Sequence, residues 1–204
     1  MPATEALLER FRAAHTQVLG VSVDSIFCHA NWGQSLGGVS FPLLADFHPK
    51  GEMTRSYGLY LDEAGITDRA TVIIDSSGIV RHASSVTPSG RRNIAELAEL
   101  CEAIDAEHGA GLSELPAPPG LDNAEILFVK SNCGFSRKVL LTRDNLHLGD
   151  RLPVKNITED PAALKNLVDL TGSDQAPCLL VGGKPIQESD EIVEVLVRGT
   201  AAIG

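Results

Sequence analysis

Cys133 lies where a short apolar strand is predicted to run into a helix. The apolar residues 126–129 precede the segment 130–136, which reads Lys-Ser-Asn-Cys-Gly-Phe-Ser. The first turn of a helix presents free backbone N–H groups and the positive end of the helix dipole, so a cysteine placed there ionises readily. Because the thiolate is the nucleophilic form of cysteine, this pattern predicts thiol chemistry at Cys133.

A proline at the start of a later predicted strand is the second feature with chemical meaning. The sequence Ala176-Pro177-Cys178 places it there, and an X–Pro bond is the common kind of cis peptide. Cys178 could act as a resolving thiol for Cys133, but packing in the core is the favoured interpretation. Cys28 and Cys101 are also expected to be structural, and the four scattered cysteines form no disulfide framework.

Composition and charge exclude several classes of partner. The formal net charge is −10 and the pI is near 5.0, which argues against binding to nucleic acid or to an anionic membrane. No apolar stretch is long enough to span a bilayer, and the N-terminus lacks the pattern of a secretory signal. A reducing cytoplasmic location is therefore expected. The dispersed histidines do not have metal-ligand spacing, so no metal site is predicted.

A proline-rich segment divides the chain into two predicted α/β domains. Residues 113–120 contain three prolines and one glycine, which continue neither a helix nor a strand. The prediction is a domain over 1–112, a linker over 113–122 and a domain over 123–204.

Hydrophobic periodicity predicts the elements of each domain. In the first domain they are a helix over 4–15, a strand over 17–24, a helix over 25–36, an extended piece over 42–46, a hairpin over 69–83 and a helix over 91–107. In the second they are a strand over 125–129, helix 134–144, strand 153–157, helix 160–170, hairpin 178–187 and helix 189–198. The second set has the βαβαββα order of a thioredoxin-like domain.

The first domain resembles the peroxiredoxins of the alkyl hydroperoxide reductase/thiol-specific antioxidant family over roughly residues 4–107. The resemblance rests on the run 18–25, followed by His29, Trp32, the run 41–46, Tyr57-Gly58 and the run 69–75. It implies that Arg69 corresponds to the arginine that these enzymes aim at the peroxidatic thiolate, and pairing of Arg69 with a surface carboxylate is an equally weighted alternative. The family's proline-threonine-cysteine loop would precede the helix that begins near Thr4, so the first domain is expected to be truncated or degenerate.

The second domain resembles the glutaredoxins and the N-terminal domain of glutathione transferases. The matched pieces are Lys130-x-x-Cys133-x-x-Ser136, the segment 175–177 and the segment 183–190. The resemblance implies that glutathione lies against the backbone before the proline, with its γ-glutamyl end at the start of the following helix. The implied substrate-binding residues are Lys130, Phe135, Ser136, Ala176, Pro177, Glu188, Ser189 and Asp190, with Cys133 as the catalytic residue. Arg69 is the second candidate catalytic residue, from the peroxiredoxin resemblance of the first domain.

Ser136 stands where dithiol members of the family have a second cysteine, which implies a monothiol route. The fold expected is α/β, with two thioredoxin-like domains of which the first is incomplete. The expected function is that of a thiol-dependent antioxidant oxidoreductase of the peroxiredoxin–glutaredoxin type, with a peroxide or a glutathionylated disulfide as substrate. The part expected to be active in this chain is glutathione-dependent disulfide exchange at Cys133, without appreciable peroxidase turnover. Glutathione is expected as co-substrate with no tightly bound cofactor, and a homodimer is a possible assembly.

Two alternatives differ in class. The first is a noncatalytic adaptor that binds glutathione or an iron–sulfur cluster, although the short lysine-to-cysteine spacing and the lack of a tryptophan before Pro177 weaken cluster binding. The second is a conjugating transferase, which is weakened because no helical domain follows residue 204.

Overall fold

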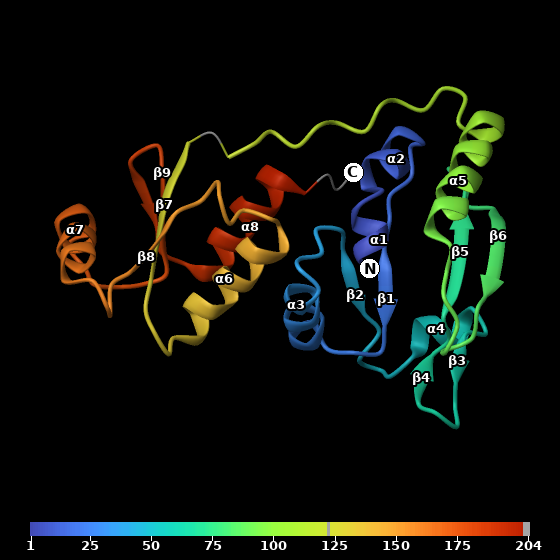
Figure 1. Cartoon of the computed structure of the whole chain (residues 1–204), viewed down its shortest axis with the longest axis horizontal. Coiled ribbons are helices and arrows are strands. Elements are labelled where there is room, and N and C mark those ends of the chain that lie inside the picture. Colours follow the sequence, from blue (N-terminus) through green and yellow to red (C-terminus); the bar gives the residue numbers. More distant parts are fainter. Residues whose placement is uncertain (122, 202–204) are drawn as a thin grey trace. The chain divides into compact units, whose positions relative to one another are not determined.

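The computed structural model describes residues 1–121 and 123–201, and its chain clusters into two compact units (Figure 1). The first unit consists of Met1–His29 and Phe41–Pro116. The second consists of Ala30–Ser40 and the described residues from Ala117 onwards. The division at 116/117 falls within the proline-rich segment.

The second unit has the predicted βαβαββα order. Every predicted element of this part is present, with bounds within two residues of those expected at each end. The elements are β7 (Ala124–Val129), α6 (Gly134–Asn145), β8 (Val154–Asn156), α7 (Pro161–Thr171), β9 (Cys178–Val181), β10 (Lys184–Ile186) and α8 (Ser189–Thr200).

The four strands of this unit form one mixed sheet in the order β10-β9-β7-β8. Strand β7 runs parallel to β8, with Leu127 opposite Val154, and antiparallel to β9, with Phe128 opposite Cys178. The first strand thus lies between the second strand and the hairpin, as in a thioredoxin-like sheet. The hairpin turn is made by Gly182 and Gly183, whose φ angles of 56° and 73° favour glycine.

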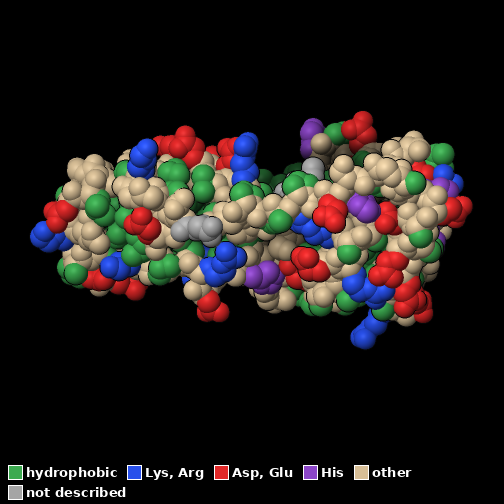
Figure 2. Space-filling model, turned by 90° about the horizontal axis from the view of Figure 1, so that it is seen from above, with side chains coloured by type: hydrophobic (Ala, Val, Ile, Leu, Met, Phe, Trp, Pro, Cys, Tyr) green, Lys and Arg blue, Asp and Glu red, His purple; other side chains and the backbone are tan. Residues whose placement is uncertain are grey.

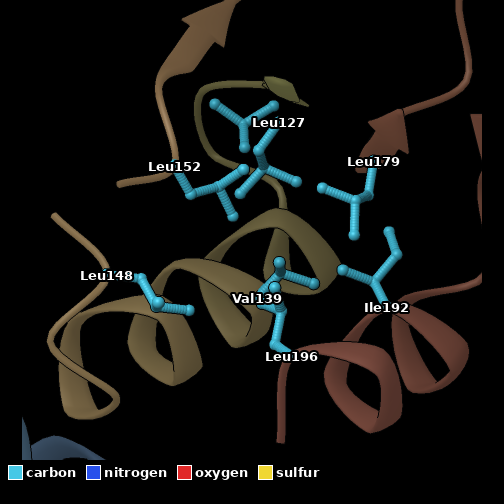
Figure 3. Packing of buried hydrophobic residues seen from close by; sticks show 8 residues of the cluster. Leu127, Val139, Leu148, Leu152, Leu179, Ile192 and Leu196 are labelled. Carbon is cyan, nitrogen blue, oxygen red and sulfur yellow. The ribbon is translucent and has the colours of Figure 1, made fainter. Parts of the chain in front are cut away.

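Alternation along the strands sends their side chains into two apolar layers. Leu127 and Val129 of β7 face the layer that contains Val139 of α6 and Ile192 of α8 (Figure 3). Phe128, between them in the sequence, faces the opposite layer, under α7. Helices α6 and α8 therefore cover one face of the sheet and α7 covers the other, which holds the end of β7 and the start of α6 in fixed positions.

Helix α7 has clear sequence signals at both ends. Asp160 precedes it, and its carboxylate accepts hydrogen bonds from the backbone N–H groups of Ala162 and Ala163. Pro161 occupies the first turn, where its missing N–H is not needed. Gly172 ends the helix with a φ of 72°.

The first unit is built from shorter elements. Its three sheets each have two strands: β1 with β2 in parallel, and β3 with β4 and β5 with β6 antiparallel. Its elements are α1 (Pro2–Glu5), α2 (Leu8–Ala13), β1 (Gly20–Ser22), β2 (Leu43–Ala45), α4 (Glu52–Ser56), β3 (Tyr60–Leu61), β4 (Ile66–Thr67), β5 (Ala70–Ile74), β6 (Val80–Ser85) and α5 (Ile94–His108). Helix α3 (Ile26–Ser35) begins in the first unit, and its residues from Ala30 onwards are assigned to the second.

Packing in the first unit is shallower than in the second. A small cluster joins Phe11 and Ala14, near α2, to Ala98 and Cys101 of α5. No residue of strands β1 to β6 is buried, whereas β7 and β9 each contain three consecutive buried residues.

Two expectations for the first unit are corrected. The single helix over 4–15 is two short helices, because the chain leaves helical geometry at Leu7, whose φ and ψ are −114° and 10°. Cys28 is exposed rather than packed in the core, whereas Cys101 is buried as expected. The α4 helix and the β3–β4 hairpin were not predicted, because their two- to five-residue lengths are too short for periodicity to register.

The molecular surface mixes charges of both signs. On the face shown in Figure 2, Lys and Arg side chains are scattered among Asp and Glu rather than gathered in one patch. Among the described residues, no helix is both long enough and apolar enough to cross a membrane.

Leu167 provides a test of the layer under α7. Its side chain is fully buried against Phe128 and Leu180, so Leu167→Ala is expected to lower the free energy of unfolding by about 2–5 kcal/mol. Leu170 lies in the same helix but is 48% exposed, and Leu170→Ala should cost about 0.5 kcal/mol or less. Urea denaturation followed by circular dichroism measures both, and equal losses would contradict the assigned layer.

Candidate active site

Cys133 is the N-cap residue of α6. Its φ of −103° and ψ of 119° are extended, and the helix begins at the next residue, Gly134. Its Sγ atom accepts a hydrogen bond from the backbone N–H of Ser136 at 3.5 Å. The sulfur therefore occupies the position where the side-chain oxygen of a capping serine or aspartate normally lies.

The surroundings of Cys133 stabilise its thiolate. Hydrogen bonds from the Ser136 side chain and backbone lower the pKa of the thiol, and the backbone N–H of Phe135 and the positive charge of Lys130 act in the same direction. Partial burial acts against them but does not outweigh them. The predicted ionisation of Cys133 thus has a local structural cause.

Ser136 connects the end of β7 to the first turn of α6. Its side chain is 1% exposed, and its Oγ atom accepts a hydrogen bond from the backbone N–H of Lys130 at 3.0 Å. The same residue supplies hydrogen bonds to the Cys133 sulfur. Ser136 is therefore placed to fix the geometry of the loop as well as the charge of the thiol.

The proline loop faces the sulfur. The Cys133 Sγ atom lies 3.9 Å from the carbonyl oxygen of Ala176, which is within reach of a weak S–H hydrogen bond. The Ala176–Pro177 bond is cis, as predicted, and Pro177 is buried. The structure thus brings together Cys133, Ser136, Ala176 and Pro177 from segments more than forty residues apart.

Two carboxylates flank the loop that leads to Cys133. The Lys130 ammonium donates a hydrogen bond to Asp174 at 2.9 Å, forming an ion pair. On the next residue, the Ser131 hydroxyl donates to Glu159 at 2.7 Å. The Asn156 side chain also donates to Glu159, at 2.7 Å, so this carboxylate is held in place by two partners.

The start of α8 contains the predicted γ-glutamyl contacts. Glu188 is the N-cap residue, Ser189 is buried, and Asp190 is exposed and forms an ion pair with Lys138 of α6. This ion pair ties α8 to the helix that begins at Cys133. Nearby, the Gln187 side chain donates a hydrogen bond to the carbonyl oxygen of Gln175 at 3.3 Å, which links the start of α8 to the proline loop.

The remaining predicted site residues have separate places. Phe135, in the first turn of α6, is 67% exposed, so its ring is available to a ligand. Arg69 belongs to the first unit and is exposed at the start of β5, where the positive charge of Arg92 is its neighbour. All other predicted site residues belong to the second unit.

Asp174, Glu159 and Asn156 were not among the predicted site residues. Asp174 lies three residues before Pro177, and an acidic side chain close to a predicted glutathione site was a signal that could have been noticed. The contacts of Glu159 and Asn156 depend on how β8 pairs with β7, which sequence spacing does not specify.

The other thiols of the chain differ in accessibility. Cys178 is fully buried under α7, and burial raises the pKa of its thiol. Burial likewise raises the pKa of Cys101. These positions agree with the packing interpretation of both residues and leave Cys133 and Cys28 as the accessible thiols.

Within the described residues, no group of three or more His, Cys, Asp or Glu side chains could hold a metal ion.

The N-terminal part of the chain is similar to known proteins. The AhpC/TSA family profile matches residues 1–83. A chloroplastic 2-cysteine peroxiredoxin of Chattonella marina var. antiqua is 39% identical over 102 residues, covering 47% of this chain and 51% of that protein. Alkyl hydroperoxide reductase C of Mycobacterium tuberculosis is 30% identical over 128 residues, covering 61% of this chain and 64% of the relative. A solved structure, Mycobacterium tuberculosis AhpC, has 31% identity and a TM-score of 0.47, covering 50% of this chain and 62% of the other.

Residues 1–83 of this mixed α/β chain thus match the AhpC/TSA family, and the chain is similar to peroxiredoxins. The chain spans between about half and two thirds of the length of these curated relatives. The relatives are named as peroxiredoxins and alkyl hydroperoxide reductases, which are thiol-dependent oxidoreductases.

The role of Ser136 can be tested through the pH dependence of alkylation. Because the pKa of Cys133 is lowered, its reaction with iodoacetamide should reach half its maximal rate below the pH typical of a free thiol. Ser136→Ala removes the largest stabilising contact, so the profile should move to higher pH and the rate at neutral pH should fall. Mass spectrometry that resolves the modified site separates Cys133 from the exposed Cys28.

Ser131→Ala is the matched control, since the Ser131 hydroxyl contacts Glu159 rather than the sulfur. Circular dichroism checks that the Ser136 variant is folded, because the change also removes the acceptor of the Lys130 N–H. An unchanged profile in a folded Ser136→Ala protein would contradict the assigned origin of the pKa shift.

Proposed function

We propose that the second unit catalyses glutathione-dependent disulfide exchange by a monothiol route, with Cys133 as the nucleophile. The observation that carries this proposal is the position of Cys133 Sγ, held as a helix N-cap, with a lowered pKa and partial exposure. An accessible, ionised thiol at a helix start is what thiol–disulfide exchange requires.

The proposed reaction has two steps. The Cys133 thiolate attacks the glutathionyl sulfur of a mixed disulfide, so that one S–S bond breaks, a bond between Cys133 and glutathione forms, and the substrate leaves as a thiolate that takes a proton from solvent. A second glutathione thiolate then attacks the adduct, which releases oxidised glutathione and restores the Cys133 thiolate. Ser136 supplies no sulfur, so no disulfide forms within the motif.

The residues around the sulfur are suited to holding the tripeptide. In this proposal the glycine carboxylate lies near Lys130, and the backbone of Ala176 beside Pro177 pairs with the cysteinyl residue. The γ-glutamyl carboxylate lies at the start of α8, where free N–H groups favour an anion, with Glu188, Ser189 and Asp190 as contacts. The exposed ring of Phe135 provides apolar contact beside the reacting sulfur.

For the whole chain we propose a thiol-dependent antioxidant oxidoreductase. The similarity of the N-terminal part to peroxiredoxins supports this assignment. In this proposal Cys133 is the active nucleophile, and Arg69 corresponds by resemblance to the arginine that those enzymes aim at the peroxidatic thiolate. Because the second unit is covalently joined to the first, it would reduce an oxidised thiol of the same protein at high effective concentration. The need for glutathione as reductant suits a reducing compartment such as the cytoplasm.

Intact-mass measurement after incubation with oxidised glutathione tests the nucleophile. Wild-type protein should gain one glutathione adduct on Cys133, and Cys133→Ser should lose it. Cys28→Ser is the matched control, because Cys28 is also accessible yet lies outside this site. An adduct of equal amount on Cys133→Ser, or none on the wild type, would refute the assignment.

Turnover separates this function from that of a noncatalytic adaptor. A catalytic unit should reduce a glutathionylated peptide repeatedly when glutathione is supplied, whereas an adaptor would form the adduct without turnover. An iron–sulfur adaptor would need ligands beyond Cys133, since the described residues contain no group of three or more His, Cys, Asp or Glu side chains that could hold a metal ion. A second copy of the chain and glutathione thiols would have to provide them.

Peroxide consumption tests the first unit separately. Disulfide exchange at Cys133 needs no peroxide, so the chain should show exchange activity with little glutathione-dependent loss of hydrogen peroxide. Rapid peroxide loss that survives Cys133→Ser and disappears with Cys28→Ser would instead assign the chemistry to the first unit.

A further inference from the structure

The Lys130 side chain is already engaged by a carboxylate of its own unit. Its ammonium lies 2.9 Å from Asp174, and 34% of the Lys130 side chain and 67% of that of Asp174 are exposed. The hydrogen bond from Lys130 lowers the pKa of Asp174, so this carboxylate is ionised at neutral pH. A ligand carboxylate that approaches Lys130 must therefore compete with Asp174.

The opposite side of the loop is also acidic. The Glu159 carboxylate accepts hydrogen bonds from the hydroxyl of Ser131, the residue that follows Lys130, and from the Asn156 side chain. The loop between β7 and Cys133 is thus flanked by two carboxylates and one ammonium group. This balance gives an incoming anion less attraction than an unpaired lysine would, because like charges at short range repel.

We propose that Asp174 is a specificity-determining residue that limits how strongly the site favours thiols bearing a carboxylate near Lys130. This inference rests on the proposed glutathione-dependent function. The ion pair opens when the glycine carboxylate of glutathione takes the place of Asp174 on Lys130. Substrates that lack this charge leave the ion pair closed and do not meet this competition.

The competition acts on recognition and is separable from the activation of the sulfur. The lowered pKa of Cys133 depends first on Ser136 and only to a lesser extent on the charge of Lys130. Replacing Asp174 should consequently change binding of the charged substrate more than the intrinsic reactivity of the thiolate. Asp174 accepts a hydrogen bond from Lys130 and acts on the site through it.

A pair of substrates that differ in one charge tests this. The probes are the mixed disulfide of glutathione with mercaptoethanol and the same compound with its glycine carboxylate converted to the ethyl ester. Cys133 attacks the glutathionyl sulfur of either one and releases mercaptoethanol. The second-order rate constant for adduct formation is measured in a single turnover by mass spectrometry.

Asp174→Asn should raise the rate constant for the acid about two- to fivefold, which is the range of an exposed ion pair, and leave that for the ester unchanged. Lys130→Gln should remove the difference between the two probes. Asp169→Asn is the matched control, because Asp169 pairs with Lys165 on the exposed side of α7 and should alter neither rate. The gain for the acid should shrink at high salt.

The other outcomes refute either the specificity role of Asp174 or the proposed function. An equal gain for acid and ester, accompanied by faster alkylation with iodoacetamide, would mean that Asp174 acts on the thiolate and would refute the specificity role. No change for the acid in Asp174→Asn would refute it as well. Wild-type protein that reacts with neither probe would instead refute the proposed function, and this is seen before any variant is compared.

Discussion

The candidate site depends on the hydrogen bonds that Ser136 makes in the first turn of α6. Its backbone N–H reaches the sulfur of Cys133, its side chain contacts the same sulfur, and its oxygen holds the backbone of Lys130. A helix start has N–H groups without partners inside the helix, so an ionised sulfur and a helix terminus satisfy each other. The charge of the thiol and the geometry of the loop therefore have a single local origin.

The rest of the second unit keeps that helix start in place. Strand β7 lies in the middle of the sheet, and its side chains alternate between the layer under α6 and α8 and the layer under α7. Burial on both faces fixes where β7 ends, and the end of β7 fixes where α6 begins. The proline loop enters through β9, the direct neighbour of β7, which brings Ala176 to the sulfur.

The sequence predicted the elements of the second unit well because each has a long periodic stretch or a clear terminal signal. The cis Ala176–Pro177 bond was predicted from residue types, and the Gly182-Gly183 turn lies inside the predicted hairpin. Contacts between side chains distant in sequence were not predicted. These include the ion pair of Lys130 with Asp174 and the hydrogen bond from Ser131 to Glu159. The exposure of Cys28 was likewise not predicted by the local sequence pattern. The incompleteness of the first domain and the residues that bind glutathione remain predictions.

A serine at position 136 has a consequence for the kind of thiol chemistry that the fold can support. Its hydroxyl is a strong acceptor for the Lys130 N–H and is almost wholly shielded from solvent. Sulfur in its place would accept that bond weakly and would be larger, so the strand-to-helix corner would loosen. A sequence that gained a second thiol here would gain an internal disulfide at the expense of corner rigidity. Position 136 can thus hold either a serine that makes the corner rigid or a cysteine that could form a disulfide with Cys133.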